Sequence, residues 1–288
     1  PQTASHLRAT QARSDFFDLS GALDAVDGVV RTLDRDGYCA SPLPLDSARV
    51  AALLDGLGSR AFQTRGPARD RLDGNDLMAL VRQGQQPPLD DGDTYWLVDQ
   101  DALVHDPHFT RLAFDPYWIA VAAAYLGVPP IHVQTHAWFS LPSARFSANL
   151  SSNAQMFHQD KEFARFLKVF IYLSDVGEEQ GPHRYVEGSH RDELHRMGPG
   201  LSDRVADKDI TRYYDASRLR TLTGPAGTVV FGDTSCVHKG EPVLRGHRIM
   251  LQLEYASSLY LSPVSPFSDF QPGQADGLPW QAADLRRM

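Results

Sequence analysis

Disulfide frameworks and nucleic-acid binding are both disfavoured by what this sequence lacks. Only two cysteines occur, Cys39 and Cys236, and they lie far apart in the chain. A disulfide framework is therefore not expected, and a reducing cytoplasm is the predicted location. The net charge is −8, so an excess of positive charge is missing as well. Because binding to a phosphate backbone needs clustered Lys and Arg, no nucleic-acid partner is expected.

Long apolar segments are also missing. No run of about 18 apolar residues, the length that spans a bilayer, occurs in the chain. The first 15 residues are polar and lack the apolar core of a signal peptide. We therefore expect no membrane contact.

What the sequence does contain is typical of one large globular domain. It has 288 residues, of which 42% are hydrophobic, with 19 Pro and 22 Gly that suit many turns between short strands. All-β domains often reach this length undivided. We predict a single domain over residues 1–288, with a helix-rich N-terminal part at about 16–128 and a β-rich core at about 130–260.

Apolar spacing predicts three helices in the N-terminal part. They are expected at residues 19–33, at 46–58 with Asp46 as the N-terminal cap, and at 116–126, where a proline begins and a glycine ends the segment. A short strand can begin at Tyr38. Residues 59–92 are rich in Arg, Asp, Gly, Gln and Pro and show little periodicity, which predicts a long loop.

Short β-rich runs separated by Gly, Pro, Asp and Ser fill the second half of the chain. Without long helices between them, they favour an antiparallel sandwich or jelly roll over a parallel sheet. The runs are IHVQTHAWFSL (131–141), AQMFHQD (154–160), FLKVFIYLSDV (166–176), HRYVEGS (183–189), GTVVFGD (227–233) and RIMLQLEYA (248–256).

Metal-binding chemistry is indicated by an H-x-D pair. His158 and Asp160 are two positions apart, so in an extended segment both side chains point to the same face. His238, just past an apolar strand, is the best candidate for a third ligand. Two imidazoles and one carboxylate leave open positions on a metal, which is typical of non-haem iron(II) oxygenases. An H-x-D pair without this support is also common among surface polar residues.

An anion site is indicated ten residues beyond His238. Arg248 begins the apolar run of residues 249–255, and a guanidinium there needs an anionic partner. Two readings stay open from the residues alone. Arg248 can bind a carboxylate of a cosubstrate such as 2-oxoglutarate, or it can pair with an internal Asp or Glu.

Three segments together give the chain a family resemblance. QMFHQD, KVFIYLSDVGEEQGPHRYVEGSHR and GTVVFGDTSCVHKGEPVLRGHRIMLQLEY resemble the phytanoyl-CoA dioxygenase family of Fe(II)/2-oxoglutarate-dependent oxygenases. The resemblance implies a double-stranded β-helix, a cupin-like jelly roll that is mainly β with flanking helices. It also implies Fe(II), 2-oxoglutarate and O₂, with iron at His158, Asp160 and His238 and the cosubstrate carboxylate at Arg248.

Further site residues are predicted from position. Phe170 stands where this family often has an aromatic residue against the cosubstrate, and Lys168 and Tyr172 share its face if the strand alternates. Gln155 is a candidate polar contact to the cosubstrate. Strand packing explains these side chains equally well.

Substrate contacts are predicted at His136, Trp138 and His183. His136 and Trp138 alternate on one face of their strand, which is either a pocket wall or a solvated outer face. His183 stands where the family more often has an apolar side chain. Residues 198–214 are polar and form either a lid over the site or a surface insertion.

The sequence therefore predicts a 2-oxoglutarate-dependent oxygenase. We expect hydroxylation of an unactivated carbon of a small molecule, an amino acid or a natural-product intermediate, with release of succinate and CO₂. Asp160 favours hydroxylation over halogenation, because halogenating relatives leave this position vacant for chloride. A non-catalytic jelly-roll binding module and a 2-oxoglutarate-independent cupin-type metal enzyme are the alternatives. Substrate identity and oligomeric state stay open.

Overall fold

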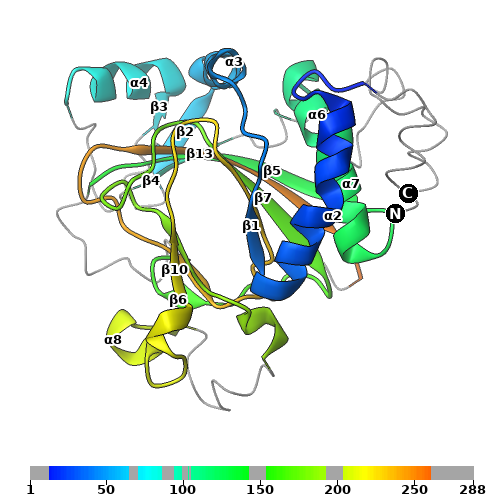
Figure 1. The fold of residues 1–288 in the computed structure, drawn as a ribbon. Coiled ribbons are helices and arrows are strands. Elements are labelled where there is room, and N and C mark those ends of the chain that lie inside the picture. Colours follow the sequence, from blue (N-terminus) through cyan, green and yellow to red (C-terminus); the bar gives the residue numbers. More distant parts are fainter. Residues whose placement is uncertain are drawn as a thin grey trace.

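Two antiparallel β-sheets form the body of the protein. The computed structural model describes residues 13–64, 71–85, 94–98, 103, 105–142, 154–192 and 204–260. The larger sheet has eight strands in the order β1-β11-β7-β13-β5-β4-β2-β3, and the smaller has five in the order β10-β8-β12-β6-β9. Helices α2 (Leu19–Asp36) and α7 (Pro116–Leu126) lie side by side next to the larger sheet (Figure 1). The architecture is that of a double-stranded β-helix, so the predicted fold class is confirmed.

The six β-rich runs predicted in the second half contain β5, β6, β7, β8, β11 and β13, whereas β9, β10 and β12 lie outside the predicted runs. Those of the larger sheet are β1 (Tyr38–Ala40), β2 (Ala61–Thr64), β3 (Arg71–Asp73), β4 (Thr94–Leu97), β5 (Ile131–Ser140), β7 (Phe166–Tyr172), β11 (Val229–Gly232) and β13 (Arg248–Ala256). Those of the smaller sheet are β6 (Phe157–His158), β8 (His183–Val186), β9 (Arg204–Val205), β10 (Leu219–Leu222) and β12 (His238–Gly240).

Strand β7 shows how alternation separates the two faces of the larger sheet. Leu167, Val169 and Ile171 belong to the main core, which also contains the buried side chains of the N-terminal helices. Phe170 and Tyr172 belong to a separate cluster with residues of β5, β11 and β13. Because side chains alternate across a strand, one face packs on the helices and the other faces the smaller sheet.

The helices begin and end at residues with clear capping chemistry. Asp18, Asp46, Asp106 and Asp115 each accept a backbone hydrogen bond at a helix N-terminus, and left-handed Gly37 and Gly127 end two helices. The helices are α2 (Leu19–Asp36), α3 (Ser47–Gly58), α4 (Gly74–Arg82), α6 (Pro107–Ala113), α7 (Pro116–Leu126) and α8 (Asp207–Ile210), with 3₁₀ turns at Ser189–Arg191 and Ala216–Arg218.

The prediction of a long loop at residues 59–92 is wrong for the part that the structure describes. That segment contributes β2, β3 and helix α4. Asp73 caps α4, and Leu77 and Met78 bury its apolar side. These elements are too short for a periodic pattern to stand out. Strand β2, next to the edge of the larger sheet, is stabilised by pairing with β4. The N-terminal part therefore adds strands to the larger sheet as well as helices.

Residues 198–214 fall partly outside the described residues. The described portion, 204–214, forms β9 and α8. Val205, Ile210 and Tyr214 pack in a small apolar cluster with Phe157 of β6. This half of the segment is therefore packed on the smaller sheet.

Among the helices that the structure describes, none is long and apolar enough to cross a membrane.

Asp115 provides a test of the packing between α7 and the N-terminal segment. Its carboxyl group is buried and accepts hydrogen bonds from Ser14 Oγ at 2.5 Å and Tyr117 N at 2.9 Å. Burial raises the pKa of Asp115 from 3.8 to about 7. The stability linked to the protonated form is therefore complete below pH 4 and is lost as the pH rises through about 7.

Asp115→Asn is expected to stabilise the protein at alkaline pH. Asn caps a helix as well as Asp and cannot ionise, so the free energy of unfolding should rise by about 2–4 kcal/mol at pH 8. The gain should shrink towards zero near pH 4. Urea unfolding of both proteins at several pH values measures the difference; a gain independent of pH would contradict the buried titration.

Candidate metal centre

Three potential metal ligands converge between the two sheets. His158 of β6 and His238 of β12 are direct partners in the strand register, and Asp160 follows β6 by two residues. One ligand atom from each lies within 4.8 Å of the others. Asp160 Oδ1 is 3.5 Å from His158 Nε2, and Asp160 Oδ2 is 3.7 Å from His238 Nε2. The sequence prediction that these residues lie together agrees with this geometry.

Backbone carbonyls orient both imidazoles. His158 Nδ1 is 2.8 Å from Met156 O, and His238 Nδ1 is 2.9 Å from Cys236 O. A carbonyl can only accept, so Nδ1 carries the proton and Nε2 keeps its lone pair facing Asp160. This is the tautomer that a metal needs from a histidine ligand.

The charge states of the triad also suit a metal ion. Burial, together with the nearby His158, lowers the pKa of His238 to about 3, so this imidazole is neutral at physiological pH. Burial acts to raise the pKa of Asp160, but the charge of Lys168 and the interactions with His158 and His238 together outweigh it and hold that pKa well below its usual range. Two imidazole nitrogens and one carboxylate oxygen are the donor set that iron(II) accepts with positions to spare. The residues therefore fit the metal that the sequence predicts.

Arg248 lies buried at the start of β13, on the interior side of the larger sheet. Its guanidinium donates to Gly181 O and, at 3.2 Å, to Ser140 Oγ. The nearby hydroxyl of Tyr172 donates to Leu222 O at 2.8 Å, and burial raises the pKa of that tyrosine.

Phe170 and His183 connect Arg248 to the triad. Their rings are 4.4 Å apart, one from each sheet. Burial lowers the pKa of His183 far below its usual value, and the charge of Arg248 lowers it further. His183 Nδ1 is buried and has no hydrogen-bond partner among the described residues. The structure thus brings His183, which the sequence suggests as a substrate contact, between the anion site and the metal site.

The predicted substrate residues of β5 face the interior, but not equally. Trp138 is buried, packs in the cluster of Phe170 and Tyr172, and lies 5.1 Å from the ring of Trp96. His136 is half-buried and its Nε2 lies 2.5 Å from Gln134 Oε1. Gln155 is buried just before β6. Its proposed contact with the cosubstrate stays a prediction.

Lys168, predicted as a cosubstrate contact, lies beside Asp160 of the candidate metal site. Its Nζ lies 2.8 Å from Asp160 Oδ2, 3.1 Å from Glu162 Oε2 and 3.9 Å from Glu254 Oε1. The ammonium group therefore contacts a ligand of the metal site. Alternation along β7 correctly predicts its inward direction, but not this partner.

Tyr185 and Glu254 are interior residues that sequence reasoning misses. The ring of Tyr185 stacks beside His238 at 5.4 Å, and its buried hydroxyl makes no hydrogen bond to the described residues. A Cβ on Gly232 would lie 2.3 Å from that hydroxyl, which explains the glycine at the end of β11. Tyr185 is two positions from His183 and Glu254 is in phase with Arg248, so strand alternation could have found both.

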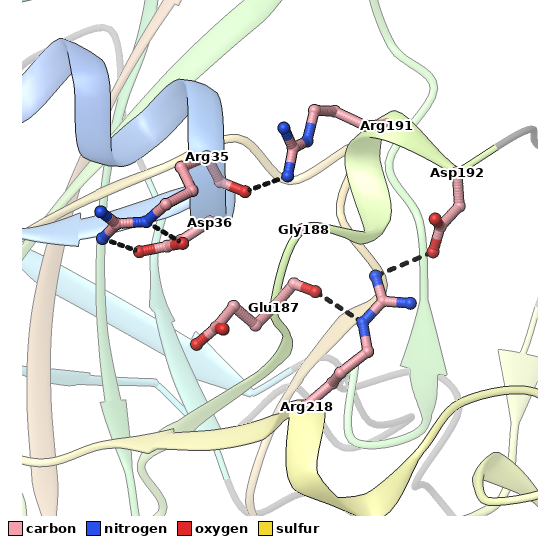
Figure 2. Close-up of a pocket in the computed structure, with 7 residues that line it drawn as sticks. All are labelled: Arg35, Asp36, Glu187, Gly188, Arg191, Asp192 and Arg218. Atoms are coloured by element: carbon pink, nitrogen blue, oxygen red, sulfur yellow. Dashed lines mark hydrogen bonds and ion pairs between the residues drawn. The ribbon is translucent and has the colours of Figure 1, made fainter.

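A separate cleft of about 540 Å³ lies outside the barrel, where α2 meets the turn after β8. Its charges pair with each other: Arg35 contacts Asp36 at 2.7 Å and Arg218 contacts Asp192 at 2.9 Å (Figure 2). None of the metal-site residues lines it. Its lining residues are Arg35, Asp36, Glu187, Gly188, Arg191, Asp192 and Arg218. This network joins the N-terminal helix to the smaller sheet.

Comparison with solved structures places the fold among non-haem oxygenases. The chain is similar to the alpha-ketoglutarate-dependent epimerase SnoN of nogalamycin biosynthesis, at 19% identity over 81% of this chain and 83% of that chain, with a TM-score of 0.54. HygX from Streptomyces hygroscopicus, with nickel and 2-oxoglutarate bound, is 16% identical over 80% and 86%, with a TM-score of 0.54. EctD from S. alaskensis, with bound Fe, is 17% identical over 91% and 86%, with a TM-score of 0.52.

The fold and the site define a jelly-roll protein of the class that uses iron and 2-oxoglutarate. The phytanoyl-CoA dioxygenase (PhyH) family profile matches residues 33–248, so the chain belongs to that family. The family resemblance predicted from the sequence is confirmed, and with it an oxygenase-type function that uses iron and 2-oxoglutarate. No curated protein matches the chain significantly.

Proposed function

We propose that the protein oxidises an unactivated carbon of a small molecule, with iron(II) held by His158, Asp160 and His238. One observation carries the proposal: two buried imidazoles and a partly buried carboxylate present their ligand atoms within 4.8 Å of one another. Three ligands from one side leave room for a cosubstrate and O₂. A structural metal site would instead close the coordination sphere with further protein ligands.

The space between the triad and Arg248 is the proposed site of 2-oxoglutarate. Arg248 supplies a buried guanidinium, a planar group that can bind the distal carboxylate of the cosubstrate through two parallel hydrogen bonds. His183 Nδ1 is a buried polar atom without a hydrogen-bond partner in the described part of the chain, and an oxygen of the cosubstrate would give it one. Phe170 and Tyr172 line the same interior face. We assign these residues to the cosubstrate rather than to the substrate.

Iron with 2-oxoglutarate and O₂ supplies an oxidant able to attack unactivated carbon, with succinate and CO₂ as the products of the cosubstrate. The chain itself positions the metal ligands and the cosubstrate and keeps water out of the interior. The carbonyls of Met156 and Cys236 hold the imidazoles, Arg248 orients the cosubstrate, and the aromatic cluster around Trp138 excludes water from the interior.

The substrate is expected to be a small molecule with polar groups, an amino acid or a natural-product intermediate. Beyond Phe170, the interior face of the larger sheet carries Gln134, His136 and Gln252, which can bind hydroxyl, amide or amino groups. SnoN has been solved with nogalamycin RO and HygX with hygromycin B, which shows that this fold binds polar small molecules in other proteins. We place His136 and Trp138 in the substrate wall.

Hydroxylation is the proposed outcome. Asp160 favours it over halogenation, because Asp160 fills the ligand position that halogenating relatives leave vacant for chloride. The similar structures include an epimerase and a carbocyclase, so the same fold also supports other oxidations. Which carbon faces the metal decides the product. A non-catalytic binding module is disfavoured by the open donor set, and a 2-oxoglutarate-independent enzyme by the buried guanidinium of Arg248. We propose a cytoplasmic location and a single domain.

Succinate formation tests the proposal. Protein loaded anaerobically with Fe²⁺ and given 2-oxoglutarate should form succinate on exposure to O₂, and a panel of amino acids and glycosides should raise the rate when the substrate is among them. Calorimetry of 2-oxoglutarate binding with and without metal is the supporting measurement. Absence of metal-dependent 2-oxoglutarate binding would refute the oxygenase and leave the binding module.

His183→Leu is expected to weaken 2-oxoglutarate binding while leaving metal affinity unchanged. A hydrogen bond to a charged group contributes about 1.5–3 kcal/mol, so the Kd should rise by roughly tenfold or more. His132→Leu is the matched control, since His132 is also a buried imidazole but packs against Phe114 and Tyr255 on the other face. Equal Kd values for His183→Leu and wild type would remove His183 from the cosubstrate site.

A further inference from the structure

Lys168 is a buried cation in contact with the metal site. Its side chain is 7% exposed, and it reaches inward from the middle of the larger sheet. The ammonium group donates to Asp160 Oδ2 at 2.8 Å and to Glu162 Oε2 at 3.1 Å. Taking an ammonium group out of water is costly unless several acceptors compensate it. The carboxylates around Lys168 provide that compensation.

A third carboxyl group contacts Lys168 from the sheet itself. Glu254 is fully buried and is the direct partner of Lys168 in the register of β7 and β13. Its Oε1 lies 3.9 Å from Lys168 Nζ, and its Oε2 accepts a hydrogen bond from Gln134 Nε2. Gln134 Oε1 in turn lies 2.5 Å from His136 Nε2. Polar contacts thus run without a break from Asp160 to the proposed substrate wall.

The contact with Asp160 has a geometric consequence for the metal. A carboxylate can offer a metal one oxygen or two. Lys168 donates to Oδ2, which also lies 3.7 Å from His238 Nε2, whereas Oδ1 receives no hydrogen bond from Lys168 and lies 3.5 Å from His158 Nε2. Partners of this kind in the outer shell fix the direction of a ligand and its strength.

We infer that Lys168 is a positioning residue that holds the Asp160 carboxylate so that it offers a single oxygen to the metal, with Glu162 and Glu254 anchoring the ammonium group. The inference rests on the proposed metal site. It assigns Lys168 to the metal ligand, where the sequence assigns it to the cosubstrate. The single-oxygen arrangement keeps one more coordination position open for the cosubstrate and O₂.

Co²⁺ is the probe for this inference, because its visible absorption reports affinity and coordination number without any turnover. Lys168→Met replaces the ammonium group with an apolar chain of similar length. We expect the Kd for Co²⁺ to rise by about 10–100-fold. We also expect the molar absorbance of the visible band to fall, since a freed Oδ2 adds a ligand to the ion.

Lys239→Met is the matched control. Lys239 is also buried, and its Nζ pairs with Asp207 at 2.6 Å and Glu241 at 2.9 Å, but it contacts none of the three metal ligands in the described contacts. A general effect of losing a buried lysine would therefore appear in both variants. Only Lys168→Met should change the Co²⁺ spectrum.

Glu254→Gln keeps the test decisive if Lys168→Met does not fold. Glutamine can retain the contact with Gln134 but loses the carboxyl oxygen that lies 3.9 Å from Lys168 Nζ, so a smaller spectral change in the same direction is expected. A folded Lys168→Met protein with the wild-type Kd and spectrum would overturn the positioning role while leaving the metal site intact. Wild-type protein that binds no Co²⁺ would overturn the proposed function together with this inference.

Discussion

Asp160→Ala is expected to lower iron-dependent succinate formation by more than about 100-fold. Loss of an outer-shell partner alone costs about 10–100-fold in metal affinity or activity, and Asp160 supplies a ligand itself. His158 and His238 keep their carbonyl contacts in this variant, so the remaining imidazoles stay oriented. Fe²⁺ affinity by competition with a chromogenic chelator, measured beside succinate formation, separates loss of metal from loss of rate.

Asp207→Ala is the control for this experiment. Asp207 pairs with buried Lys239, just as Asp160 pairs with buried Lys168. Lys239 follows His238 on β12, so its side chain and Asp207 lie on the face of the smaller sheet opposite to the metal ligands. The control should bind Fe²⁺ like the wild type. Retention of Fe²⁺ affinity and succinate formation in Asp160→Ala would show that the triad is not the metal centre and would withdraw the proposed function.

Arg248→Met should weaken 2-oxoglutarate binding roughly 30-fold or more and leave Fe²⁺ affinity unchanged. Removing one partner of a buried, hydrogen-bonded charge pair costs about 2–5 kcal/mol. Arg248→Lys should bind 2-oxoglutarate more weakly than the wild type and more tightly than Arg248→Met, because an ammonium group cannot reproduce the two parallel hydrogen bonds of a guanidinium. The Kd from calorimetry and the KM for 2-oxoglutarate should rise together.

A control variant and the melting temperatures separate a role of Arg248 in binding 2-oxoglutarate from a structural role. Arg184→Met removes an arginine of β8 that pairs with Glu241 at 3.1 Å, away from the interior, and should leave the Kd unchanged. Arg248 also braces Gly181 O and Ser140 Oγ, so the melting temperature of each variant is needed. A less stable Arg248→Met protein with an unchanged Kd for 2-oxoglutarate would make Arg248 structural.

Short-range patterns made the metal ligands readable from the sequence. His158 and Asp160 are two positions apart on one segment, and His238 follows an apolar strand, so their roles depend on local spacing and on the family resemblance. The inward direction of Lys168, Phe170 and Tyr172 follows from alternation along β7. These features need no knowledge of which strand lies opposite.

Contacts between distant segments could not be read in the same way. Lys168 meets Asp160 across the two sheets, and it meets Glu254 through the register of two strands far apart in sequence. The strands at residues 61–64 and 71–73 are too short to show a pattern in the sequence. They are stabilised by pairing, because β2 pairs with β4 at the end of the larger sheet and β3 pairs with β2. Pairing of this kind is decided by global packing.

The sequence alone therefore determined the fold class, the three ligand types and the candidate anion-binding arginine, because strand periodicity and ligand spacing are local properties of the chain. Tertiary structure alone decided which interior groups face one another. It placed His183 between Arg248 and the triad, brought Lys168 onto Asp160, and stacked Tyr185 beside His238. Register and sheet-to-sheet packing bring together residues distant in the chain, and no local pattern encodes those pairs.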